Sequence, residues 1–115
     1  MANYVHRLKL KNNISTEDIL PVRFSENEHD PEALVKHLFE DMEEGFSRKV
    51  KPGDFLVAGQ NFGCGPSRES APIALKSSGL RAVIGQSFSR IFYRNSFNAG
   101  LCLVECETNY IDDMD

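Results

Sequence analysis

Hydrophobic positions along the chain fall into short runs that predict strands alternating with helices. Residues 4–10 alternate loosely between apolar and polar side chains, and continuous apolar runs occupy residues 55–58, 82–84 and 101–104. These runs predict four strands, of which those at 55–58 and 82–84 are buried. Because helical patterns separate the last three strands, the second half predicts βαβ units and a partly parallel sheet.

The first half of the chain contains one clear helical pattern. Asp30 suits an N-cap, and Pro31 suits the first helical position because proline has no backbone N–H to satisfy there. Apolar residues then recur at helical spacing through Met42, which predicts one amphipathic helix ending near Gly45. Residues 12–16 are polar and are expected to form a turn.

Two further helices are expected in the second half. One begins after residue 68, carries Pro72 in its first turn and stops at Gly79. The other is capped by Ser87 and closed by Gly100. A glycine-rich segment, residues 59–68 with the sequence GQNFGCGPSR, lies before the first of them and is expected at a strand–helix junction.

This glycine-rich segment is the candidate for chemistry. Three glycines let the backbone adopt positive φ, and a helix start offers N–H groups and a favourable dipole to an anion. Ser67 adds a hydroxyl, and Arg68 adds a guanidinium that can pair with a carboxylate through two hydrogen bonds. The spacing is neither a P-loop nor a dinucleotide fingerprint. A carboxylate or phosphate site and a purely structural turn, with Ser67 as a cap, both remain open.

Composition places the chain among single-domain globular proteins. It has 115 residues, of which 41% are hydrophobic and 26% charged. No apolar run approaches the roughly 20 residues that cross a bilayer, and the N-terminus has no signal-peptide core, so we expect a cytoplasmic protein without a membrane partner. Cysteines at 64, 102 and 106 form neither a disulfide framework nor a metal motif, so no metal site is expected in this chain.

Charge is distributed unevenly around a net value of −4. Residues 26–44 carry eight acidic side chains and one basic one, whereas residues 62–100 carry five basic side chains and one acidic one. The acidic total argues against a nucleic-acid partner. The positive second half contains the glycine-rich segment and therefore suits a small anionic ligand.

Three stretches of the sequence carry a resemblance to a known family. They are residues 15–21, STEDILP, residues 53–76, GDFLVAGQNFGCGPSRESAPIALK, and residues 82–95, which include SFSRIFYRN. Together they resemble the small-subunit family of 3-isopropylmalate dehydratase, the counterpart of the swivelling domain of aconitase. The resemblance implies an α/β fold, a layered β/β/α domain with a partly parallel sheet. Family members continue for several tens of residues after Leu101, so we expect residues 1–115 to be one swivelling domain that is short at its C-terminal end.

The resemblance also implies a partner and a cofactor. A separate large subunit would hold a [4Fe–4S] cluster that acts as a Lewis acid, and this chain would bind no cofactor itself. The small subunit would supply the substrate-binding loop. The implied reaction is isomerisation of a small hydroxy-di- or tricarboxylate by removal and re-addition of water. The chain would be active only with its large subunit.

Roles for individual residues follow from the same resemblance. Ser67 and Arg68 are the implied catalytic residues, as base and carboxylate anchor, and Gly63 and Gly65 join them in binding substrate. The family pattern is Gly-Ser-Ser-Arg-Glu, whose first serine is the base in aconitase, but this sequence has Pro66 there. Proline has no side-chain proton acceptor. Either Ser67 or another group therefore serves as the base, or the chain is a non-catalytic anion-binding or regulatory module of the same fold.

A second departure from the family concerns substrate choice. The family usually carries Tyr-Leu and a variable pair after its Ile-Ile-Pro element, but residues 22–29 here read VRFSENEH. Arg23 is the candidate for a further substrate contact, with a surface role as the alternative. Without Tyr-Leu, the sequence does not specify isopropylmalate as the substrate.

Overall fold

Four strands form a single parallel sheet in the computed structural model, which describes residues 5–7, 12–25, 30–42, 45–65 and 69–107. They are β1 (Val5–Arg7), β2 (Phe55–Val57), β3 (Ala82–Gly85) and β4 (Leu103–Glu105), hydrogen-bonded in that order. Each pairing among the described strands is parallel, which confirms the predicted fold class. The last strand begins two residues later than expected, because the N–H of Leu101 still donates to the Ser96 carbonyl at the helix end.

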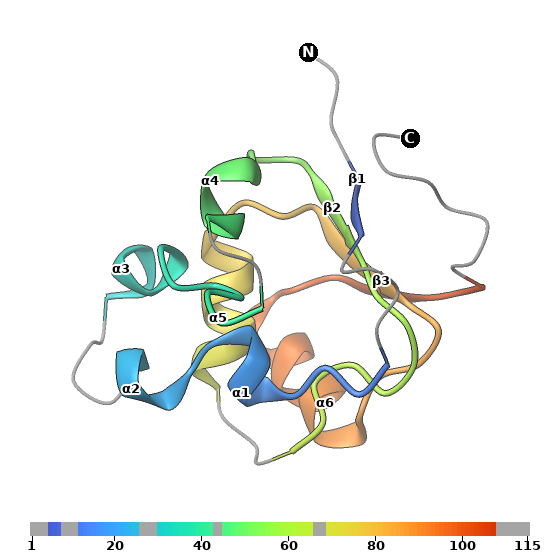
Figure 1. Ribbon diagram of the computed structural model, residues 1–115. Coiled ribbons are helices and arrows are strands. Elements are labelled where there is room, and N and C mark those ends of the chain that lie inside the picture. The colour runs from blue at the N-terminus through green and yellow to red at the C-terminus, as the bar shows by residue number, and fades with distance from the viewer. Residues whose placement is uncertain (1–4, 8–11, 26–29, 43–44, 66–68, 108–115) are drawn as a thin grey trace.

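Helices connect the strands and gather beside one face of the sheet, as Figure 1 shows. They are α1 (Thr16–Ile19), α2 (Val22–Ser25), α3 (Pro31–Val35), α4 (Phe46–Lys49), α5 (Ser70–Ser77) and α6 (Arg90–Ala99). Helix α5 packs against both α3 and α6. Within the described ranges, no helix has the length and apolarity that a bilayer crossing requires.

An aromatic cluster ties both halves of the chain together in the core. The ring of Phe62, from the glycine-rich segment, is fully buried and meets the Phe92 ring of α6 edge-on, with centroids 5.3 Å apart. Phe39 lies 6.5 Å from Phe62 and meets Phe46 edge-on at 4.9 Å. Such pairs add about 0.5–1.5 kcal/mol beyond the area they bury. The glycine-rich segment is therefore anchored through the core.

Several predicted helix signals are confirmed. The carboxylate of Asp30 caps α3 by accepting a backbone N–H, and Pro31 is its first residue. Pro72 lies in the first turn of α5. Gly100 closes α6 in the left-handed conformation, with φ of 80°.

The predicted helix ending near Gly45 is wrong in its second half. Helix α3 ends at Val35, and residues 36–42 form successive turns. Phe39 has a φ of 54°, and its N–H donates to the carbonyl of Ile19 at 2.8 Å. This long-range hydrogen bond and the complete burial of the Phe39 ring outweigh the local helical pattern.

One predicted helix start is wrong, and one helix begins where only a turn was predicted. Ser89, not Ser87, caps α6, because its hydroxyl accepts from the backbone N–H of Phe92 at 3.3 Å. The polar turn expected at residues 12–16 leads directly into α1. There Ser15 and Asp18 form a capping box, each side chain accepting the other's backbone N–H at 3.0 Å.

Candidate functional site

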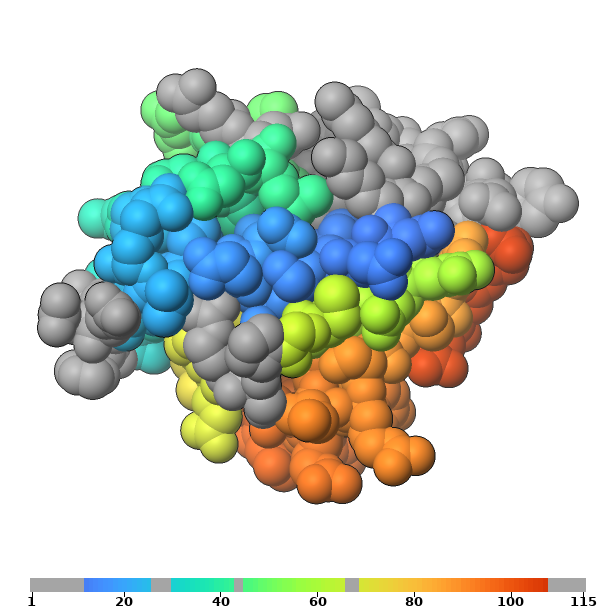
Figure 2. Space-filling view, turned by 60° about the horizontal axis from the view of Figure 1, so that its bottom comes forward, coloured from blue at the N-terminus to red at the C-terminus, as the bar shows by residue number. Residues whose placement is uncertain are grey.

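The glycine-rich segment lies at the carboxyl end of the sheet, between the segments that follow β1 and β3. Isolated parallel bridges pair Cys64 with Ser15 on one side and Phe62 with Phe88 on the other. Figure 2 shows the three segments as adjacent bands, blue for the first, yellow-green for the glycine-rich segment and orange for the third. The carboxyl edge is where open parallel sheets bind their ligands.

Neighbouring segments use the first backbone donors of the glycine-rich segment. Four consecutive N–H groups are hydrogen-bonded at 2.7–3.1 Å, from Gln60 to the Asn12 side chain, from Asn61 to the Ser87 hydroxyl, from Phe62 to the Ser87 carbonyl and from Gly63 to the Ile14 carbonyl. These donors hold the segment in place and do not point at a ligand. Residues 60–63 therefore offer no free backbone donor to an anion.

Two asparagines brace the same region, and the sequence pattern did not single them out. Asn13 and Asn61 have φ values of 59° and 56°, a left-handed conformation that asparagine tolerates better than most residues. The side-chain amide of Asn61 donates to the Asn13 side-chain oxygen at 3.0 Å. The N–H of Asn13 donates to the Gln60 carbonyl at 2.8 Å. The sequence signals that could have identified them are the position of Asn13 in the polar turn and the position of Asn61 within the glycine-rich segment.

Positive φ favours glycine at both Gly63 and Gly65, and close packing adds a second reason at Gly63. Both have positive φ, 83° and 92°. A Cβ at Gly63 would lie 2.2 Å from Cγ of Phe92, so the helix α6 approaches this backbone too closely for any side chain. A Cβ at Gly65 would meet nothing closer than the Cβ of Ser15 at 3.6 Å. Gly63 thus has a packing role, and the binding roles of both glycines stay predictions.

Ser67, Arg68 and Pro66 lie outside the described residues, so their roles stay predictions. The described residues on either side are Gly65, which lies against the start of α1, and Glu69, the N-cap of α5. The segment therefore leads from β2 to α5, at the strand–helix junction that the sequence predicts.

Arg23 lies on α2 and forms an ion pair with Asp41. Its Nη1 and Nη2 donate to the two carboxylate oxygens at 2.9 and 2.6 Å. The hydrogen bonds from Arg23 hold the pKa of the Asp41 carboxyl below its usual value, and the same bonds raise the pKa of the guanidinium. The guanidinium also lies over the Phe24 ring, 4.4 Å from its centroid. The structure shows Arg23 half-exposed and paired with Asp41, and both its substrate contact and its alternative surface role stay predictions.

Metal-binding side chains do not cluster in the part of the chain that the structure describes. No group of three or more His, Cys, Asp or Glu there could hold an ion. Cys64 is half-buried in the glycine-rich segment, whereas Cys102 and Cys106 are exposed near β4, and all three are free thiols. The described residues thus offer no ligand set for an iron–sulfur cluster.

Comparison with known protein families covers nearly the whole chain. Residues 4–109 match the family described as the aconitase C-terminal domain. The chain belongs to the aconitase C-terminal domain family.

Relatives of this aconitase C-terminal domain are proteins of greater length. A 3-isopropylmalate dehydratase small subunit from Thermodesulfovibrio yellowstonii is 52% identical over 112 residues, which cover 93% of this chain and 66% of the relative. One from Caldicellulosiruptor saccharolyticus is 57% identical over 99 residues, covering 86% of this chain and 57% of the relative. The crystal structure of 3-isopropylmalate dehydratase (LeuD) from Methanocaldococcus jannaschii has a TM-score of 0.92 at 43% identity, covering 98% of this chain and 66% of that chain. The chain thus spans about three-fifths to two-thirds of their length.

Proposed function

We propose that this aconitase C-terminal domain is the small subunit of a heteromeric hydro-lyase of the 3-isopropylmalate dehydratase type, acting in the cytoplasm. The observation that carries the proposal is identity of 52% and 57% with proteins named as the small subunit of that enzyme. The words "small subunit" point to a large subunit as the partner. The glycine-rich segment at the carboxyl edge of the sheet supports a ligand-binding role.

The proposed reaction moves a hydroxyl group between adjacent carbons of a hydroxy diacid. A base removes the proton from the carbon beside a carboxylate, the hydroxyl leaves with a proton as water, and water adds back across the new double bond. A [4Fe–4S] cluster in the large subunit would supply the Lewis acid for departure of the hydroxyl. Proton transfer and substrate orientation then remain for this chain.

Within this chain, we assign proton transfer to Ser67 and the substrate carboxylate to Arg68. A guanidinium presents two parallel N–H donors that match a carboxylate, and it also stabilises a serine alkoxide. Because the N–H groups of residues 60–63 are engaged inside the protein, substrate contacts are expected from Gly65 onward. Gly63 takes part by keeping the segment close to α6.

Arg23 is the proposed contact for a second carboxylate. To reach a substrate, its guanidinium must leave Asp41. Both side chains are about half exposed, at 54% and 50%, and ion pairs exposed to solvent contribute little to stability. Exchange of the Asp41 carboxylate for a substrate carboxylate is therefore energetically feasible.

Reconstitution tests the proposal. The chain is mixed with the large subunit that accompanies the T. yellowstonii relative, its cluster is rebuilt without oxygen, and the unsaturated diacid is followed by ultraviolet absorbance after 3-isopropylmalate is added. The T. yellowstonii small subunit serves as the positive control. Activity is expected only when both chains are present. If the control pair is active and this chain gives no product with isopropylmalate or related hydroxy diacids, the proposal is wrong.

Variants then separate the assigned roles. Ser67→Ala is expected to lower kcat by about 10²–10⁴, because a general base contributes that much. Arg68→Lys is expected to raise KM by about 10–100-fold, because one point charge replaces a two-donor contact worth roughly 1.5–3 kcal/mol. Arg81→Lys is the matched control, since Arg81 is exposed before the amino end of β3. If only Pro66→Ser produces activity, the non-catalytic alternative replaces the proposal.

A further inference from the structure

Two exposed asparagines join the glycine-rich segment to the turn that follows β1. The side-chain amide of Asn61 donates to the side-chain oxygen of Asn13 at 3.0 Å, and the N–H of Asn13 donates to the Gln60 carbonyl at 2.8 Å. Both asparagines have positive φ, a conformation that most other residues adopt only with strain. Asn13 and Asn61 are called the asparagine pair below.

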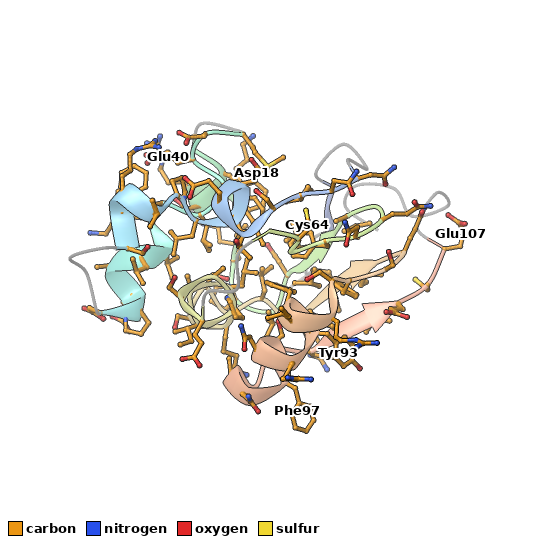
Figure 3. All side chains as sticks on the ribbon, turned by 90° about the horizontal axis from the view of Figure 1, so that it is seen from below. Asp18, Glu40, Cys64, Tyr93, Phe97 and Glu107 are labelled. Carbon is orange, nitrogen blue, oxygen red and sulfur yellow. The ribbon has the colours of Figure 1, made fainter. Side chains whose placement is uncertain are left out.

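The turn that carries Asn13 also holds the later residues of the glycine-rich segment. This turn leads into α1, and the N–H of the first residue of α1 donates to the Cys64 carbonyl at 2.9 Å. Figure 3 shows Cys64 next to α1, the helix on which Asp18 is labelled. A Cβ at Gly65 would lie 3.6 Å from the Cβ of Ser15. The segment is therefore in contact with this turn and the start of α1 as far as Gly65.

Only three residues separate Gly65 from Glu69, the N-cap of α5. They include Ser67 and Arg68, to which proton transfer and the substrate carboxylate are assigned above. So short a connection has few conformations, so a shift of Gly65 relative to α5 changes the positions open to both side chains. Misplacing a reacting group by about 1 Å can lower a rate by as much as about 100-fold. The position of Gly65 therefore matters for the rate.

We propose that Asn13 and Asn61 are positioning residues, whose hydrogen bond controls where Ser67 and Arg68 meet the substrate. The inference rests on the proposed function, because it concerns the rate of that reaction. Since the hydrogen bond is exposed, water can replace it in a variant without leaving a buried polar group unsatisfied. Its loss should therefore shift the glycine-rich segment with little change in the stability of the fold.

Kinetics of the reconstituted two-chain enzyme test the inference. Asn13→Gly keeps positive φ accessible and removes the acceptor, and Asn61→Gly does the same for the donor. Each is expected to lower kcat about 2–10-fold, the range that one neutral hydrogen bond supplies, at a temperature where circular dichroism shows every variant folded. Asn13→Asp keeps an acceptor oxygen and should retain the wild-type kcat. A purely structural role would lower the unfolding temperature and leave kcat unchanged.

A double variant separates the hydrogen bond from backbone flexibility, which each new glycine also increases. If the hydrogen bond controls the rate, combining Asn13→Gly with Asn61→Gly should lower kcat no further than either change alone. Gln86→Ala is the matched control, because it removes another exposed side-chain hydrogen bond, from Gln86 to Glu107 at 2.9 Å, and it should leave kcat unchanged. Additive losses, an unchanged kcat in the single variants, or an equal loss in the control would each overturn the inference.

Amide hydrogen exchange of this chain alone keeps the inference distinct from the proposed function. The N–H of Gly63 donates to the Ile14 carbonyl at 2.7 Å, next to the asparagine pair. Asn13→Gly should speed exchange of this N–H about 2–10-fold and leave that of Val83 in β3 unchanged. Unchanged exchange at Gly63 overturns the inference, whether or not the two chains are active together. Faster exchange beside an inactive wild-type enzyme supports the positioning of the segment and counts against the proposed function alone.

Discussion

Replacing Gly63 with alanine is expected to destabilise the protein by about 2–5 kcal/mol. The left-handed backbone, with φ of 83°, costs an L-residue about 1–2 kcal/mol. The new methyl group would also lie 2.2 Å from Cγ of Phe92 and 2.6 Å from its Cβ and Cδ1. Phe92 is only 2% exposed and contacts Phe62, so relieving this overlap should cost a further 1–3 kcal/mol or so. Such a loss is a large part of the roughly 5–15 kcal/mol that holds a domain folded.

Gly65→Ala provides the matched control for this prediction. Its φ of 92° carries the same backbone cost, but its Cβ would meet nothing closer than 3.6 Å. Urea denaturation followed by circular dichroism should therefore give a loss of about 1–2 kcal/mol for Gly65→Ala and a clearly larger one for Gly63→Ala. In a Phe92→Ala background, Gly63→Ala should cost less than it does in the wild type, because Cγ and Cδ1 of the ring, two of the three overlapping atoms, are gone. Equal losses for the two glycine variants would refute the argument from close approach to Phe92.

Three further substitutions test separate features. Asp41→Asn removes the pair with Arg23. The pKa of Asp41 is lowered in the folded state, so the ion pair stabilises the fold above the usual carboxyl pKa and this stabilisation is lost as pH falls through the lowered pKa. The variant and the wild type should therefore differ in urea midpoint at about pH 7, and their midpoints should converge at about pH 2. Ser96→Ala should leave the unfolding free energy unchanged or raise it by about 1 kcal/mol, because the buried Ser96 hydroxyl has no hydrogen-bond partner among the residues that the structure describes. A loss above about 1 kcal/mol would contradict this. Ser89→Ala should instead cost about 1–2 kcal/mol in thermal or urea unfolding, because the hydroxyl caps α6 and also binds the Gly63 carbonyl, and an unchanged midpoint would contradict this.

Local patterns predicted the second half of the fold better than the first. The strands at β2 and β3, the first turn of α5 and the C-terminal end of α6 follow from apolar runs and from glycine and proline positions, all of which act within a few residues. The first half depends on distant contacts. Phe39 leaves the helical conformation because its N–H binds Ile19 and its ring joins Phe62, and no local spacing encodes either contact.

The sequence predicted where the glycine-rich segment lies between the strands and helices, but it did not predict which residues hold the segment in place. A glycine-rich run after a buried strand correctly placed the segment at the junction of β2 and α5. Its support by Asn13 and Ser87 was not predictable, because those residues come from other strand ends. The sequence predicted Ser87 as a helix cap, whereas its hydroxyl accepts a hydrogen bond from the backbone N–H of Asn61.

The hydrogen bonds that hold the glycine-rich segment also have a consequence for folding. They join residues 48 positions apart, Gln60 to Asn12, and 26 positions apart, Asn61 to Ser87. Contacts of such sequence separation require the chain entropy of long loops to be lost before they contribute, so they slow the folding of the chain. Any anion that binds there would select the completed fold and raise the free energy of unfolding in proportion to the logarithm of its concentration.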